Sequence, residues 1–174
     1  MTQPNLQTVD WSTIPAPEDD GAAAHLAGVR MPDVTLPATD GGEVALGRLR
    51  GRSVIFFYPM TGRPDLALPD GWDQIPGARG CTPQSCAFRD LSRDLAECGV
   101  TALYGISTQS TDYQREAAAR LHLPFPLLCD ADLALTKALS LPTLEVEGMV
   151  LIRRMALILR DDVIEKVFYP VFPP

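Results

Sequence analysis

Residues 53–59 read Ser-Val-Ile-Phe-Phe-Tyr-Pro, and this apolar stretch organises the expected fold. Its apolar residues, Val54 to Tyr58, form the longest apolar run in the chain and show no polar alternation, which is typical of a strand buried on both faces. A run of this length cannot cross a bilayer. The stretch therefore predicts the central strand of a sheet, not a membrane segment.

The residues before this strand predict a hairpin and an arm. Apolar residues alternate at 34–36 and 44–46 around Asp40-Gly41-Gly42, which is a hairpin signature. Three prolines within residues 1–24 exclude a continuous helix there. We expect residues 1–24 to form an extended N-terminal arm and residues 25–174 to form one domain.

The residues after this strand predict a long loop and then alternating helices and strands. Residues 59–80 contain four prolines and four glycines, and a loop of that length within a domain is usually functional. Thr82-Pro83 predicts the N-cap and first position of a helix that runs to about Glu97. Further elements are expected as strand 101–107, helix 111–122 opened by a capping box at Thr111–Gln114, strand 127–128, helix 133–139, and strands 150–159 and 163–168. This alternation predicts an α/β fold with a mixed sheet flanked by helices.

Composition excludes several classes of function. The 174 residues are 46% hydrophobic and 21% charged, which fits a single globular domain. The net charge is −7 and no basic cluster occurs, so nucleic-acid binding has no electrostatic support. Residues 1–5 lack a basic and apolar leader, which predicts a cytoplasmic protein without membrane association. In a reducing compartment the four cysteines are expected to be free, metal-bound or redox-active, and not to form a structural disulfide frame.

Cys81 and Cys86 are the candidate reactive residues. On a helical wheel that buries Phe88, Leu91 and Leu95, Cys81 projects inward at the start of the helix, and Cys86 lies about 200° from Phe88 on the solvent-facing side. The N-terminus of a helix favours a thiolate, and a second thiol nearby can condense with a sulfenic acid to form a disulfide. The helix alone leaves a redox pair and two unrelated cysteines both open.

The sequence resembles the peroxiredoxins, and the Q subgroup (bacterioferritin comigratory protein) in particular. The resemblance runs from about Gly28 to Tyr169. It is carried by the hairpin residues 32–42, the strand 54–59, the segment 80–90 with four residues between its two cysteines, Gly105-Ile106-Ser107, and residues 123–130. It implies a thioredoxin-like fold and a thiol peroxidase. In such an enzyme Cys81 attacks hydrogen peroxide or a small organic hydroperoxide, and Cys86 resolves the product as an intrachain disulfide.

The resemblance also implies the partners of the reaction. A thioredoxin-like reductant would recycle the disulfide, no bound cofactor or metal is needed, and a monomer suffices because Cys86 lies in the same chain. Two alternatives on the same fold remain, a thiol–disulfide oxidoreductase and a redox-sensing module. The first would favour Cys-x-x-Cys over the four-residue spacing found here.

The chain departs from the family around its motif Pro-x-x-x-Thr-x-x-Cys, because Gln74 and Ala78 occupy the proline and threonine positions. Pro59 can serve as the motif proline if about fifteen residues are inserted before Cys81, at about 60–78. Thr61 is then the candidate threonine that contacts peroxide, and Thr82 is its competitor. The insertion, which carries Trp72 and Ile75, is expected to line or cover the site.

The family also holds its thiolate with an arginine from a distant strand. The alignment selects Arg154, with Arg153 as the second choice, and only one of the two can reach because strand neighbours point to opposite faces. Cys98 and Cys129 are expected to take no part. His25 and His122 are too few and too far apart for a metal site or a catalytic triad.

Overall fold

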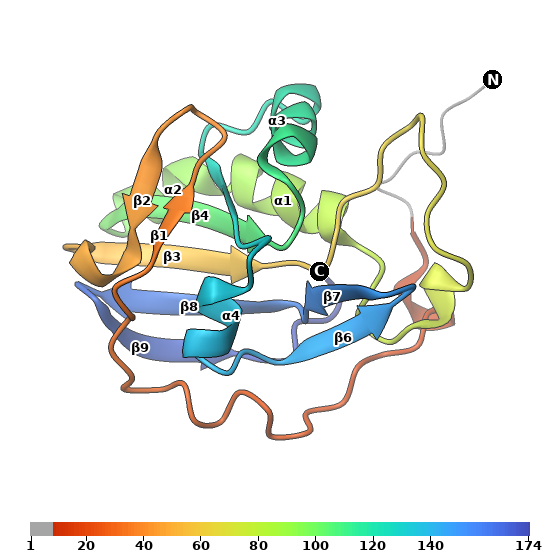
Figure 1. The fold of residues 1–174 in the computed structure, drawn as a ribbon, viewed down its shortest axis with the longest axis horizontal. Helices are drawn as coiled ribbons and strands as arrows, with labels where there is room; N and C mark the ends of the chain where they lie inside the picture. Colours follow the sequence, from red (N-terminus) through yellow and green to blue (C-terminus); the bar gives the residue numbers. More distant parts are fainter. Residues whose placement is uncertain (1–8) are drawn as a thin grey trace.

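A five-stranded sheet forms the centre of the molecule in the computed structural model, which describes residues 9–174 (Figure 1). The strand order is β5 (Leu127–Cys129), β4 (Val100–Ser107), β3 (Arg52–Phe57), β8 (Met155–Arg160) and β9 (Val163–Phe168). Strands β3, β4 and β5 are parallel, whereas β8 is antiparallel to β3 and β9 is antiparallel to β8. The sheet is therefore mixed, as the sequence predicts.

Helices follow each of the parallel strands along the chain and cover both faces of the sheet. They are α1 (Cys81–Asp90), α2 (Ser92–Glu97), α3 (Thr111–Arg120) and α4 (Ala134–Ala138), with short 3-10 turns at Trp11–Thr13, Leu46–Arg48 and Trp72–Gln74. In Figure 1, α1 and α2 lie behind the sheet and α4 lies in front of it. The expected α/β architecture is confirmed.

The central strand β3 is buried because successive side chains point to opposite faces and both faces are covered. On one face the ring of Phe56 stacks on Phe88 of α1, with centroids 4.4 Å apart. On the other face Ile55 and Phe57 belong to a cluster that includes Leu135 of α4. The apolar run that opens the sequence analysis thus forms the core of the domain.

Two hairpins flank the sheet. The predicted N-terminal hairpin forms from β1 (Thr35–Pro37) and β2 (Glu43–Ala45). A second hairpin, β6 (Thr143–Val146) and β7 (Met149–Ile152), is not predicted. The predicted strand 150–159 is wrong, because β7 pairs with β6 whereas β8 pairs with β3, and the chain leaves one sheet for the other between them.

The helix predicted from Thr82 to Glu97 differs in its start and its continuity. It begins at Cys81 with Gly80 as N-cap, so Thr82 is not the cap. A bend at Leu91, with φ −93° and ψ 1°, separates α1 from α2. Because of this bend, a helical wheel drawn through one continuous helix misplaces Leu91. The wheel buries Leu91 in the core, whereas its side chain is 52% exposed.

The predicted capping box of α3 is also wrong. Ser110 is the N-cap, and its Oγ accepts the backbone N–H of Tyr113 at 3.3 Å. Gln114 is fully buried instead, where its amide donates to Ser107 Oγ at 3.0 Å and to the Leu128 carbonyl at 2.8 Å. The Gln114 amide thus makes hydrogen bonds to other elements instead of capping its own helix.

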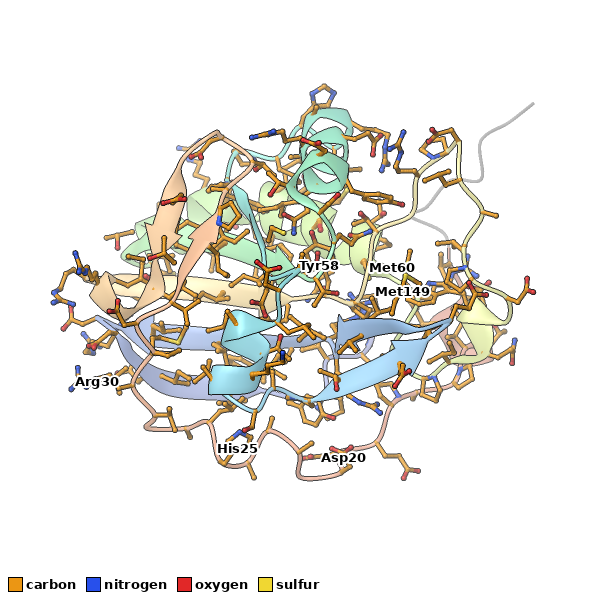
Figure 2. All side chains as sticks on the ribbon, in the orientation of Figure 1. Asp20, His25, Arg30, Tyr58, Met60 and Met149 are labelled. Carbon is orange, nitrogen blue, oxygen red and sulfur yellow. The ribbon has the colours of Figure 1, made fainter. Side chains whose placement is uncertain are left out.

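The described part of the N-terminal arm lies along the edge of the sheet. Residues 1–8 of the predicted arm lie outside the described residues. From residue 9 the chain forms one 3-10 turn and then passes β9, where the Gly28 N–H donates to the Ile164 carbonyl at 2.8 Å. Figure 2 marks this course with Asp20, His25 and Arg30. Within residues 9–174, no helix combines the length and apolar character needed to cross a membrane.

Candidate active site

Cys81 lies at the point where the loop after β3 enters helix α1. The loop begins at Tyr58 and Met60, which Figure 2 shows directly after the end of β3. Gly80 ends it with φ 113°, a conformation that favours glycine, and Cys81 is the first helical residue. The Cys81 side chain is 3% exposed and its thiol lies 3.6 Å from the Ala78 carbonyl. The backbone N–H groups of a helix start favour negative charge at this sulfur.

Arg154 brings a positive charge to the sulfur of Cys81. It lies between β7 and β8, is 3% exposed, and its Nη2 donates to Cys81 Sγ at 3.2 Å. The same nitrogen donates to the carbonyls of Ala78 at 3.1 Å and Arg79 at 3.2 Å, which ties the end of the loop to the sheet. Arg153 points elsewhere and donates to the Thr143 carbonyl. The structure thus places Arg154, and not Arg153, beside the thiol.

Gln84 is a site residue that the sequence analysis does not identify. Its Oε1 accepts from Arg154 Nη1 at 2.5 Å, and the side chain is 2% exposed. Its Nε2 has no hydrogen-bond partner among the described residues. The available signal was spacing, since a residue three positions after Cys81 lies on the same face of a helix.

Pro59 and Thr61 lie in the first part of the loop and are both buried. The Thr61 backbone N–H and hydroxyl donate to Gln109 Oε1 at 3.0 and 3.2 Å, and Gln109 Nε2 donates back to the Thr61 carbonyl. The Thr61 hydroxyl is therefore hydrogen-bonded to Gln109, and among the described residues no hydrogen bond joins Thr61 to Cys81. Thr82, the competitor, lines the same pocket as Cys81. A role for either threonine stays a prediction.

All four cysteines are free thiols. Cys86 lies on α1 with Cys81 and is half-buried, so it is less exposed than the helical wheel indicates. Cys98 is exposed after the end of α2, and Cys129 is buried at the end of β5. Cys81 and Cys86 are therefore the two cysteines that share one element.

A pocket of about 650 Å³ opens over Cys81. Its lining comes from the arm, from the loop after β3 with the start of α1, and from the end of α3. Most of its exposed lining is apolar, from Val9, Trp11, Met60, Leu68, Trp72 and Leu121. Trp72, from the predicted insertion, thus lines the site, whereas Ile75 packs behind it in a cluster with Val146 and Leu151.

The site can form a stabilised thiolate at the bottom of an apolar pocket. Burial raises the pKa of the nearby Tyr58 hydroxyl well above its ordinary value, so this group stays protonated at neutral pH. Among residues 9–174, no group of three or more His, Cys, Asp or Glu side chains is placed to hold a metal ion.

Comparison with known proteins identifies the family. The redoxin model matches residues 26–174. The chain belongs to the redoxin family. It is 35% identical over 106 residues to a Coxiella burnetii protein named as a peroxiredoxin bcp, which covers 60% of each chain. It is 29% identical over 148 residues to the chloroplastic peroxiredoxin Q of Oryza sativa subsp. japonica, which covers 84% of this chain and 60% of the rice protein. The redoxin chain thus spans about 60% of the length of these first relatives.

Solved structures give the same relationship. The peroxidoxin BcpB of Mycobacterium tuberculosis has a TM-score of 0.64 and 26% identity, over 82% of this redoxin and 84% of that chain. The bacterioferritin comigratory protein of Xanthomonas campestris, described for its alkyl peroxide reduction activity, has the same TM-score at 22% identity, over 83% and 88%. The predicted resemblance to peroxiredoxins of the Q subgroup and the predicted thioredoxin-like fold are confirmed.

Proposed function

We propose that this redoxin is a thiol peroxidase that reduces hydrogen peroxide and small organic hydroperoxides through Cys81. The observation that most supports the proposal is the 3.2 Å contact between the Arg154 guanidinium and Cys81 Sγ at a helix start. A cation, a helix N-terminus and an overlying pocket are what a peroxide-reducing thiolate needs. The peroxiredoxin names of its relatives and the alkyl peroxide reduction of the Xanthomonas protein agree with this chemistry.

The first step forms a sulfenic acid. The Cys81 thiolate attacks the distal oxygen of the peroxide, an S–O bond forms and the O–O bond breaks. The sulfur is oxidised, and the leaving alkoxide or hydroxide takes a proton from solvent and departs as alcohol or water. Arg154 stabilises the thiolate before the attack and the negative charge on the oxygens during it.

The second step forms a disulfide. The Cys86 thiol attacks the Cys81 sulfenic acid, the S–S bond forms and water leaves. Residues five apart on an α-helix have Cα atoms about 8–9 Å apart, whereas a disulfide needs about 4.4–6.8 Å. The start of α1 therefore unwinds for this step. A thioredoxin-like dithiol then restores both thiols by exchange.

The remaining assignments belong to the same proposal. We assign Pro59 and Thr61 to the loop that shapes the peroxide site, with Thr82 as the alternative hydroxyl next to the sulfur. Residues 25–174 form the catalytic domain, residues 1–24 its arm, and about 60–78 the inserted loop. A monomer in the cytoplasm, where thiols stay reduced, fits four free cysteines and an intrachain resolving thiol.

Single cysteine variants test the proposal. Cys81→Ser is expected to abolish peroxide consumption coupled to a thioredoxin system, because a serine hydroxyl stays protonated where the thiol ionises. Cys86→Ser is expected to consume one equivalent of peroxide and stop at a sulfenic acid, which mass spectrometry detects after dimedone labelling. Cys98→Ser is the matched control and should turn over like the parent.

The outcomes separate the proposal from its rivals. Substantial turnover by Cys81→Ser would remove this residue as nucleophile. Stoichiometric oxidation of the parent without repeated turnover would favour a redox sensor. Reduction of protein disulfides without peroxide consumption would favour a thiol–disulfide oxidoreductase.

A further inference from the structure

The wall of the pocket over Cys81 includes a residue from the far N-terminal arm. Trp11 lines the pocket together with Leu68 and Trp72 from the loop after β3. Trp72 is 5% exposed and packs with Ala78, so that side of the wall is anchored in the domain. Trp11 is half-buried and comes from a segment outside the sheet. The arm therefore completes a pocket that the domain forms only in part.

Trp11 is held in place by contacts at two sides. Its ring meets the ring of Phe172 edge to face, with centroids 6.0 Å apart. A Cβ atom added at Gly80, the residue before Cys81, would lie 3.0 Å from the Trp11 ring. The indole thus lies between the C-terminal segment and the start of α1, in the wall of the pocket that opens over Cys81.

The arginines at the pocket are already paired and offer no free cation to an anionic ligand. Three arginines line the pocket, and each already binds a carboxylate: Arg63 with Asp65 at 2.7 Å, Arg79 with Asp73 at 2.6 Å, and Arg120 with Glu116 at 2.7 Å. Asp73 itself lines the pocket, and the whole chain carries a net charge of −7. A ligand with a carboxylate would compete with these ion pairs, whereas a neutral apolar group would meet the indole rings and Leu68.

We propose that Trp11 is a specificity-determining residue, and that the pocket it completes selects neutral hydroperoxides with a bulky apolar group over hydrogen peroxide. The inference rests on the proposed peroxidase function. Hydrogen peroxide has no apolar surface to bury, so it gains nothing from the indole. An aryl or branched alkyl group gains binding energy in proportion to the apolar area that it removes from water.

The test compares second-order rates of Cys81 oxidation by three probes. These are hydrogen peroxide, cumene hydroperoxide and a cumene hydroperoxide that carries a ring carboxylate, measured by stopped flow on the full chain. In the parent, cumene hydroperoxide should react faster than its carboxylated analogue. Trp11→Ala should lower the cumene-to-hydrogen-peroxide rate ratio roughly tenfold, the size expected when a pocket loses part of an apolar wall.

Three further variants control the result. Leu66→Ala removes a 53% exposed side chain of the same loop that does not line the pocket, and it should keep the parent's ratio. Trp11→Phe should retain most of the selectivity, which shows that the ring and not general stability is responsible. Phe172→Ala should lower the ratio less than Trp11→Ala, because Phe172 acts by positioning the indole.

A ratio for Trp11→Ala within about twofold of the parent would overturn the inference, because an apolar wall is worth more than that. A faster reaction of the carboxylated probe would overturn the charge argument and the inference with it. If no peroxide oxidises Cys81 in the parent, the proposed function itself fails. Oxidation of the parent with an unchanged ratio in Trp11→Ala would overturn the inference and leave the proposed function intact.

Discussion

At the scale of single residues, the buried guanidinium of Arg154 requires an anionic partner. Its hydrogen bonds reach one amide oxygen, three backbone carbonyls and Cys81 Sγ. All of these partners except the sulfur are neutral, and its Nε has no partner among the described residues. A buried charge without a counter-ion is costly. Cys81 Sγ is the atom among these contacts that can carry a negative charge, so a thiolate there would be the counter-ion of the guanidinium.

Replacement of Arg154 by alanine should slow the reaction of Cys81 with peroxide roughly ten- to hundredfold, the effect of losing a charge-assisted hydrogen bond in a buried site. Stopped-flow oxidation measures the effect. Arg153→Ala is the matched control, because Arg153 binds the Thr143 carbonyl instead. The opposite ranking of the two variants would assign the role to Arg153.

Some of these residues can be identified from sequence and others cannot. Cys81 and Cys86 stand out because helix geometry and spacing act locally, and Arg154 follows from the family resemblance. Trp11 carries no such signal, and Gln84 carries only its spacing of three residues from Cys81. Gln84 looks like an ordinary helix residue until Arg154 is placed beside it, and the position of Trp11 depends on contacts with Phe172 and Gly80, which are distant in sequence.

At the scale of elements, helix α1 carries both proposed reactive thiols and must change shape for them to join. The first hydrogen bond within the helix runs from the Gln84 N–H to the Gly80 carbonyl. The N–H groups before Gln84 have no partner within the helix, so its first turn has few internal hydrogen bonds to lose. Helix ends open at low free-energy cost. Opposing this, the Phe56–Phe88 stack fixes the second half of the helix on the sheet.

Oxidation should therefore remove amide protection from residues 79–86 and leave the helix after Phe88 less affected. Hydrogen exchange on the reduced and oxidised forms, read by mass spectrometry, tests this. Cys86→Ser treated with peroxide is the control, because it oxidises at Cys81 without forming the disulfide. Equal protection of residues 79–86 in both forms of the parent would contradict the unwinding.

Strand β4 allows the aromatic core to close because Gly105 has no side chain. A Cβ atom there would lie 2.5 Å from Phe56 Cζ and 2.7 Å from Leu127 Cδ2. Gly105→Ala should destabilise the domain by about 1–3 kcal/mol, the usual effect of overpacking a core. Gly42→Ala, where the added atom meets only the end of the Asp40 side chain at 3.3 Å, should cost less than about 1 kcal/mol. Denaturant unfolding measures both, and equal stabilities would contradict the close approach.

Elements with strong local patterns are predictable from this sequence. The apolar run of β3, the β1–β2 turn and strand β4 need no tertiary information. The β6–β7 hairpin is missed although Glu147 and Gly148 form its turn with φ of 50° and 79°. The apolar residues before and after Arg153-Arg154 together predict one strand, which hides the change of sheet. Sequence periodicity shows which residues are buried, and here it does not show which strand they pair with.

At the scale of the whole molecule, polar contacts hold the arm and the residues just after it against the C-terminal part of the domain. Arg30 binds Asp162 at 2.6 Å, and this pairing lowers the pKa of Asp162 below its ordinary value. Farther along, the Tyr169 hydroxyl donates to Asp20 Oδ1 at 2.9 Å. Both contacts join a residue of the N-terminal segment to one directly beside β9.

Because of the Tyr169–Asp20 contact, the attachment of the arm to the domain should depend on pH in the alkaline range. Burial, and then the hydrogen bond to Asp20, raise the pKa of Tyr169 to about 12, whereas an unfolded chain has a tyrosine pKa of about 10. A group whose pKa is raised in the folded state stabilises it fully below the unfolded value and loses that effect as pH rises through the folded value. The contribution of Tyr169 to the free energy of unfolding should therefore be complete below about pH 10 and vanish near pH 12.

The free energies of unfolding of the parent and Tyr169→Phe should differ at neutral pH and converge across this window. The comparison cancels the titration of the other tyrosines and of the thiols, and a constant difference up to the end of the window would show that the hydroxyl does not hold the arm.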